Sequence, residues 1–159
     1  MSTIEKKVIT DNFNKLIEES NFTEATALLS SALSNEIDEE FRIWIYDNLG
    51  FLTYFSGNIN GALDWCDKSL ALKPDNSYAL KGRGICLAKL GQLEDGIKSL
   101  LQSIALDPAF FDPHHDLAVI LLEAGRFNEA KKWAQRAYQL DPEKGESLVR
   151  MFYQDKSEN

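Results

Sequence analysis

One interval of 34 residues recurs along the chain in three kinds of residue. It separates successive members of three sets: Pro74, Pro108 and Pro142; Gly57, Gly91 and Gly125; Leu72, Leu106 and Leu140. Proline and glycine mark turns and leucine marks a core, so an interval that all three share is an internal repeat. A period near 34 residues is typical of stacked helix–turn–helix units. Because stacked helix pairs build an extended surface, the period also favours binding over catalysis.

Each repeat contains two stretches with helical spacing, separated by a glycine turn. In the first stretch the residues predicted to face the core stand at the fourth, seventh, eighth and eleventh places: Tyr46, Leu49, Gly50 and Thr53; Leu80, Arg83, Gly84 and Leu87; His114, Leu117, Ala118 and Leu121. The i, i+3, i+4, i+7 spacing belongs to one helix face. The small residue at the eighth place predicts close approach of the second helix. The glycine after the stretch is expected to end the helix in the left-handed conformation.

These positions resemble the tetratricopeptide repeat family. The resemblance is carried by Leu49, Gly50, Gly57, Ala62 and Pro74 in the first copy, Gly84, Gly91 and Pro108 in the second, and Leu117, Gly125, Ala130 and Pro142 in the third. It implies an all-α fold, an α-solenoid of antiparallel helix pairs in a right-handed superhelix with a C-terminal capping helix. The sequence departs from the family pattern at Arg83, Gly96 and His114.

The predicted organisation is a single tetratricopeptide domain over residues 1–159. It comprises a divergent repeat at 5–38, regular repeats at 43–76, 77–110 and 111–144, and a capping helix at 145–155. In the divergent repeat, Phe13, Leu16 and Ile17 are expected to form the core face of the first helix. Leu148, Met151 and Phe152 are expected to turn the capping helix toward the array, because a terminal repeat otherwise exposes its apolar side.

Charge and cysteine content narrow the class of partner. The 25 acidic and 17 basic residues leave a formal net charge of −8, which disfavours nucleic acid and anionic membranes as partners. No secretory signal or membrane-spanning segment is visible. Cys66 and Cys86 lie in predicted helices without metal-ligand spacing, so we expect buried free thiols, no metal and a cytoplasmic location.

The resemblance implies a concave groove lined by the first helix of each repeat. The groove residues selected as a peptide-binding site are Trp44, Asp47, Asn48, Phe51, Tyr78, Lys81, Ile85, His115, Asp116 and Val119. The first repeat is aromatic there and the third acidic. Binding is the favoured interpretation for Trp44 and Phe51, whereas packing under the N-terminal repeat is favoured for Tyr54 and Phe55.

The resulting hypothesis is a partner peptide with an apolar anchor near Trp44 and Phe51 and a basic residue near Asp116. Asp112 precedes Pro113, a favoured first helical residue, so the preferred interpretation makes Asp112 a helix cap. Arg83 is expected to find a carboxylate partner or to extend toward solvent.

Enzymatic and cofactor-dependent functions are not supported. The sequence contains no Walker loop, Gly-x-Ser-x-Gly elbow or Rossmann fingerprint. Adjacent His114 and His115 point about 100° apart on a helix and are the only two histidines. Some family members bind the C-terminal carboxylates of chaperones through basic residues in the groove. In this sequence Thr10, Tyr78 and Gly82 occupy the corresponding places, which argues against that function.

The predicted function is a non-enzymatic protein-interaction adaptor without a cofactor, which binds a peptide or helix of another protein. A small secretion-type chaperone and a self-associating module, for example a homodimer, are the alternatives.

Overall fold

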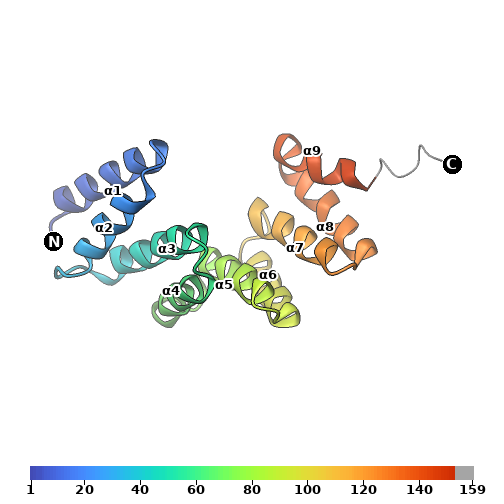
Figure 1. Cartoon of the computed structure of the whole chain (residues 1–159), viewed down its shortest axis with the longest axis horizontal. Coiled ribbons are helices and arrows are strands. Elements are labelled where there is room, and N and C mark those ends of the chain that lie inside the picture. Colours follow the sequence, from blue (N-terminus) through green and yellow to red (C-terminus); the bar gives the residue numbers. More distant parts are fainter. Residues whose placement is uncertain (153–159) are drawn as a thin grey trace. The chain divides into compact units, whose positions relative to one another are not determined.

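The computed structural model of the chain describes residues 1–152, and all regular secondary structure in that part is helical. Its helices are α1 (Thr3–Glu18), α2 (Phe22–Ala32), α3 (Glu39–Phe55), α4 (Ile59–Leu72), α5 (Ser77–Lys89), α6 (Leu93–Leu106), α7 (Phe111–Glu123), α8 (Phe127–Leu140) and α9 (Pro142–Met151) (Figure 1). The predicted all-α class and its helix-pair organisation are confirmed.

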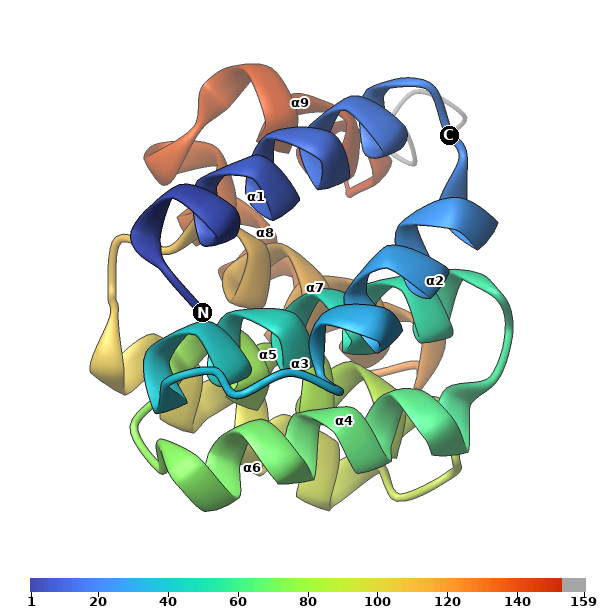
Figure 2. The ribbon, with the colours of Figure 1, turned by 90° about the vertical axis from the view of Figure 1, so that its left-hand side faces the viewer.

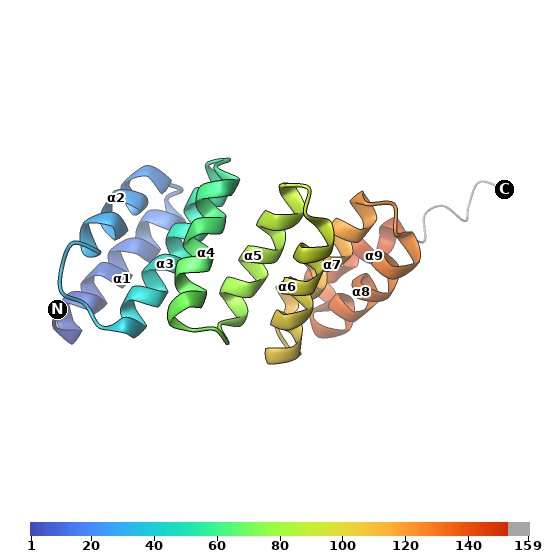
Figure 3. The same cartoon turned by 90° about the horizontal axis from the view of Figure 1, so that it is seen from below.

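The chain divides into two compact units. The N-terminal unit is Met1–Ala79 and holds α1 to α4, while the C-terminal unit begins at Leu80 and holds most of α5 together with α6 to α9. In the N-terminal unit α1 pairs with α2 and α3 pairs with α4 (Figure 2). In the C-terminal unit α8 packs against both α7 and α9 (Figure 3).

Short polar side chains start several of the helices. Ser2 and Glu5 form a reciprocal capping box at the start of α1, and the Asp38 carboxylate accepts a hydrogen bond from the Phe41 N–H at 2.9 Å at the start of α3. Asn58 accepts from the Gly61 N–H, also at 2.9 Å, at the start of α4. Each contact satisfies a backbone donor that the first turn of a helix leaves without a carbonyl partner.

The glycines that carry the 34-residue interval end the first helix of each regular pair. Gly57, Gly91 and Gly125 have φ values of +85°, +84° and +75°, so the predicted left-handed caps are confirmed. The N–H of Gly57 donates to the Tyr54 carbonyl at 2.9 Å, which closes the last turn of α3.

Ser20 occupies the same turn in the first helix pair without being glycine. Its φ is +56°, and its N–H donates to the Ile17 carbonyl at 2.9 Å, as Gly57 does to Tyr54. A side chain in this conformation costs about 1 kcal/mol or more. The first pair therefore keeps the turn geometry of the others although its sequence lacks the glycine.

Each unit has its own apolar core. In the N-terminal unit α1, α2 and α3 bury Phe13, Ala25, Leu29, Ala32, Ile37, Phe41, Ile45, Leu49 and Leu52, and Leu16 and Ile17 pack against them. In the C-terminal unit α6, α7 and α8 bury Ile97, Leu100, Leu117, Ile120, Leu121 and Ala130. Of the predicted core-facing places, Tyr46, Thr53 and Arg83 are only half-buried and the other nine are buried. Cys66 and Cys86 are buried thiols that form no disulfide, as predicted.

Helices α5 and α6 approach each other through two glycines. A Cβ atom placed on Gly84 would lie 2.8 Å from the Gly96 carbonyl oxygen, and one placed on Gly96 would lie 2.7 Å from the Gly84 carbonyl oxygen. The small eighth place is thus a close helix contact, as predicted. Gly50 is less crowded, because its Cβ would lie 3.5 Å from the Cβ atom of Trp65.

The capping helix α9 covers a small apolar cluster on α7 and α8. Leu148 is buried with Ala118 and Ala134, and Phe152 packs against them. Met151 is exposed, so the expectation that it faces the array is wrong. At 100° per residue, Met151 lies roughly 90° from the centre of the face formed by Gly145, Leu148 and Phe152. Residues 153–155 of the predicted capping helix lie outside the described residues.

Candidate functional site

The ten residues selected from the sequence fall on three helices in the two units. In the N-terminal unit, Trp44, Asp47, Asn48 and Phe51 lie on α3, and Tyr78 lies on α5. In the C-terminal unit, Lys81 and Ile85 lie on α5, whereas His115, Asp116 and Val119 lie on α7.

Trp44 is half-buried and packs α3 against α1. Its ring stacks on Phe41 with centroids 5.3 Å apart and meets the edge of Phe13 at 5.4 Å. These two contacts occupy much of the indole surface that a ligand would use. This packing depends on α1. Because α1 lies outside the regular 34-residue period, the period does not predict the contact.

Asp47 belongs to a buried polar network. Its carboxylate accepts hydrogen bonds from Ser69 Oγ at 2.6 Å and from Asn76 Nδ2 at 2.8 Å. Burial raises the pKa of Asp47, and the two hydrogen bonds oppose that shift. The carbonyl oxygen of the Asn76 side chain accepts from the backbone N–H groups of Tyr78 and Ala79, so the network also starts α5.

The remaining selected residues of the N-terminal unit differ in their availability. The Asn48 side chain donates to the Trp44 carbonyl at 2.7 Å within α3. Phe51 packs against the core, whereas Tyr78 is exposed.

Phe55 is the most accessible aromatic side chain at the C-terminal end of α3. Its ring lies 4.7 Å from that of Phe51 and 5.6 Å from that of Tyr54, yet 62% of Phe55 is exposed. The expectation that Phe55 packs under the N-terminal repeat is therefore wrong. Phe55 is the last residue of α3.

Ion pairs link α5 to α7 in the C-terminal unit. Lys81 Nζ lies 3.8 Å from Asp112 Oδ2, and Lys89 Nζ lies 3.4 Å from Glu123 Oε2. Helix α7 begins at Phe111 and Phe110 is its cap residue, so the expected capping role of Asp112 is wrong. Asp112 already lies inside the first turn, where an acidic side chain is favourable.

His115 and Asp116 lie side by side on α7. His115 Nδ1 is 3.5 Å from Asp116 Oδ1, and the imidazole ring lies 5.6 Å from that of Phe111. Ile85 on α5 and Val119 on α7 are half-buried, and Val119 also packs against the apolar cluster under α9.

His114 is a core residue. Only 1% of it is exposed, and its Nδ1–H donates to the Phe110 carbonyl at 2.9 Å. Burial lowers the pKa of His114, and the charge of Arg136 adds to that effect. Arg83, the other unusual core-facing residue, donates from Nη1 to Ser99 Oγ at 3.0 Å.

The lowered pKa of His114 predicts acid sensitivity. Below about pH 6.5 the unfolded chain binds a proton that the folded chain resists. The free energy of unfolding should therefore decrease as the pH is lowered, by at most about 1.4 kcal/mol per pH unit for one site. The fall should stop below the pKa of the folded state. Urea denaturation between about pH 7 and pH 5 measures this slope. His114→Leu should flatten this slope. A slope retained in His114→Leu would contradict the assignment.

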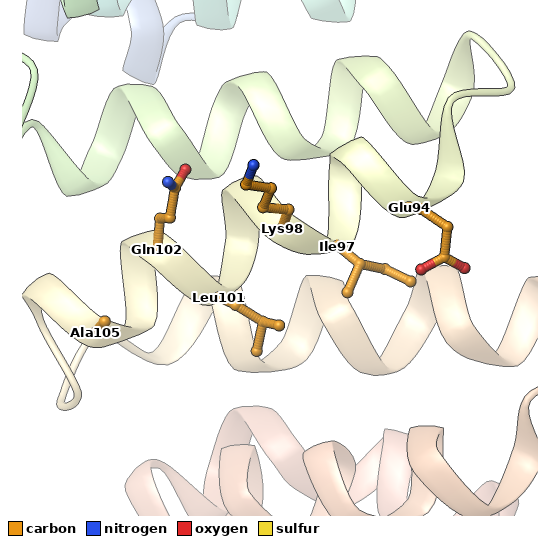
Figure 4. A pocket seen from close by; sticks show the side chains of 6 residues that line it. All are labelled: Glu94, Ile97, Lys98, Leu101, Gln102 and Ala105. Atoms are coloured by element: carbon orange, nitrogen blue, oxygen red, sulfur yellow. The ribbon is translucent and has the colours of Figure 1, made fainter.

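One surface hollow was not foreseen from the sequence. It is an open depression along α6, lined by Glu94, Ile97, Lys98, Leu101, Gln102 and Ala105 (Figure 4). Leu101 is exposed there.

Two features are absent from residues 1–152. In that part of the chain no helix is both long enough and apolar enough to cross a membrane. The same residues include no group of three His, Cys, Asp or Glu side chains positioned to hold a metal ion.

Comparisons with known proteins agree with this architecture. A family model described as tetratricopeptide repeat matches residues 111–144. The chain is 31% identical over 83 residues to the TPR repeat-containing thioredoxin TTL4 of Arabidopsis thaliana, covering 52% of this chain and 12% of that protein. It is 26% identical over 138 residues to the peroxisomal targeting signal receptor of Eremothecium gossypii, covering 87% of this chain and 22% of that one.

A solved structure shows the same fold at low sequence identity. The structure of YrrB, described as a TPR protein with an unusual peptide-binding site, superimposes with a TM-score of 0.70 at 17% identity. The match covers 94% of this chain and 74% of YrrB. The chain spans less than a quarter of either curated relative, so the likeness to them concerns the repeat region alone.

Proposed function

Because this chain is a tetratricopeptide-repeat protein, we propose that it is a non-enzymatic, cytoplasmic interaction module that captures a segment of a partner protein. In the N-terminal unit the candidate binding residues lie on α3 and at Tyr78, and in the C-terminal unit they lie on α5 and α7. The preferred partner segment carries apolar residues and a basic residue.

The observation that carries this proposal is the exposed aromatic group at the end of α3. Phe55 keeps 62% of its surface in water while its ring contacts Phe51 and Tyr54. An aromatic side chain gains free energy when a partner removes it from water, and it loses little side-chain entropy on binding. Residues of this type dominate the energy of many protein interfaces.

The apolar anchor is accordingly Phe55, supported by Phe51. Trp44, the anchor favoured by the sequence, already uses its ring against Phe13 and Phe41. Asp47 likewise uses both carboxylate oxygens inside the Ser69–Asn76 network. These two residues therefore contribute to the packing of the N-terminal unit.

Peptide selection tests this proposal. Random peptides displayed on phage are selected on the full chain, and the Kd of each selected peptide is measured by fluorescence polarisation. Phe55→Ser should weaken binding by roughly tenfold or more, the loss expected for a hot-spot aromatic. Phe127→Ser is the matched control, because Phe127 is also 62% exposed but lies at the start of α8.

Three results would count against the proposal. They are failure to select any peptide, equal losses in the two phenylalanine variants, and binding that survives Phe55→Ser. Circular dichroism of both variants shows whether the helices are intact.

Self-association is a second candidate, which one observation favours. Ile4 and Val8 are exposed one turn apart on α1, so α1 presents an apolar strip that a second copy would bury. Light scattering after size exclusion decides this, because a monomer at high concentration excludes the dimer. A secretion-type chaperone would use the same peptide surface and differ only in its partner.

A further inference from the structure

We infer that Asp116 is the cation-binding subsite of the C-terminal unit, and that Lys81 and Lys89 restrict its ligand to a segment with a single basic residue. This inference rests on the proposed function and names the chemistry of the partner segment. It follows from the pattern of paired and unpaired charges along α5 and α7.

Two lysines of α5 already neutralise two carboxylates of α7. Lys81 pairs with Asp112 at 3.8 Å and Lys89 pairs with Glu123 at 3.4 Å. The two lysines are eight residues apart on α5, about two helical turns. The pairs therefore set the register of α5 against α7 at two points along their length.

Asp116 lies between Asp112 and Glu123 on α7, and α5 has no lysine at the position that corresponds to it. It follows Asp112 by one turn of α7, and the residue that follows Lys81 by one turn of α5 is Ile85. The contact that the structure gives Asp116 is with its chain neighbour, His115 Nδ1, at 3.5 Å. Asp112 and Glu123, the first and last carboxylates of this row on α7, each have a lysine partner, whereas Asp116 has no lysine partner among the described residues.

The surroundings of Asp116 strengthen its interaction with a cation. Its side chain is 22% exposed, against 49% for Asp112 and 56% for Glu123. A carboxylate that is partly shielded from water binds an opposite charge more strongly than one that is fully hydrated.

The ligand chemistry that fits is one arginine or lysine within an otherwise apolar segment. The aliphatic stem of either residue can pack on Ile85 and Val119, which are half-buried apolar side chains of α5 and α7. Arginine is favoured because its planar guanidinium binds both oxygens of a carboxylate. A polybasic segment gains nothing further, because Asp112 and Glu123 are already paired.

The test uses the phage-displayed peptide library on the full chain and on three variants. Wild type should enrich peptides with one basic residue, arginine above lysine. Asp116→Asn should still select peptides but lose the basic preference, and it should weaken binding of the wild-type peptides by roughly tenfold. Glu123→Gln is the matched control, since it removes the same charge from the same helix and should leave the preference unchanged.

The variant Lys81→Gln tests the role of the internal lysines. It exposes the Asp112 carboxylate, so the selected peptides should now contain two basic residues. Peptides without basic enrichment in wild type, or a basic preference that survives Asp116→Asn, would overturn the inference while leaving the proposed function intact. Absence of any selected peptide would instead reject the proposed function, and equal losses in Asp116→Asn and Glu123→Gln would reduce the effect to net charge.

Discussion

Gly96→Ala is expected to lower the free energy of unfolding by about 2 to 3 kcal/mol. The added Cβ would lie 2.7 Å from the Gly84 carbonyl oxygen and 3.0 Å from the Ala88 backbone nitrogen. Both neighbours are backbone atoms, so the overlap can be relieved only by moving α5 and α6 apart. The gain of about 1 kcal/mol from replacing a helical glycine by alanine is too small to offset that strain.

Gly50→Ala is the matched control for this substitution. Its Cβ would meet the Cβ atom of Trp65 at 3.5 Å, an ordinary contact distance. We therefore expect its stability to stay unchanged or to rise by up to about 1 kcal/mol. Urea denaturation followed by far-UV circular dichroism measures both variants. A neutral Gly96→Ala would mean that the close approach of α5 and α6 is not needed for stability.

Asn76→Ala is expected to lower the free energy of unfolding by about 2 to 4 kcal/mol. The substitution removes the 2.8 Å hydrogen bond to the Asp47 carboxylate and the 3.0 Å bond to Ser69 Oγ. It also removes the acceptor for the backbone N–H groups of Tyr78 and Ala79 at the start of α5. A buried carboxylate that loses a donor is costly, because burial alone already disfavours its charged form.

The matched control is Asn58→Ala, which removes a cap at the start of α4. Asn58 is exposed and its side chain accepts a single bond from the Gly61 N–H at 2.9 Å. We expect a loss of about 1 kcal/mol, the usual contribution of such a cap. Chemical denaturation near neutral pH compares the two variants. Equal losses would show that Asn76 contributes only as a cap and that its bond to Asp47 adds nothing.

The pH dependence separates these contributions further. The raised pKa of Asp47 means that the folded chain takes up a proton on this group at a higher pH than the unfolded chain. Protonation relieves the cost of the buried charge, so the loss caused by Asn76→Ala should be smaller in acid than at neutral pH.

The turns and most core-facing places followed directly from the sequence. The left-handed glycines and the close contact at Gly84 depend on residues only a few positions apart or on the size of one side chain. Ser20 adopts the same left-handed turn without glycine, so the sequence carries no glycine signal for this turn. Local geometry of this kind can be predicted from the sequence because helix periodicity and turn chemistry act over a few residues.

The candidate site was less predictable. Trp44 and Phe55 have the same aromatic character in the sequence, yet Trp44 packs between Phe13 and Phe41 while Phe55 is exposed. The sequence predicts Asp112 to be a cap, but Lys81 of the preceding repeat pairs with it. Each of these outcomes depends on a contact with another helix.

The 34-residue interval by itself determined the helical class, the position of the turns and the small residues that let paired helices approach. Tertiary structure decided which aromatic side chains stay exposed and which carboxylates are already paired, and therefore which residues remain available to a partner. The physical reason is the separation of the groups involved. Turns form within a few residues, whereas Lys81–Asp112 and Lys89–Glu123 join side chains 31 and 34 residues apart, whose pairing depends on how whole helices pack.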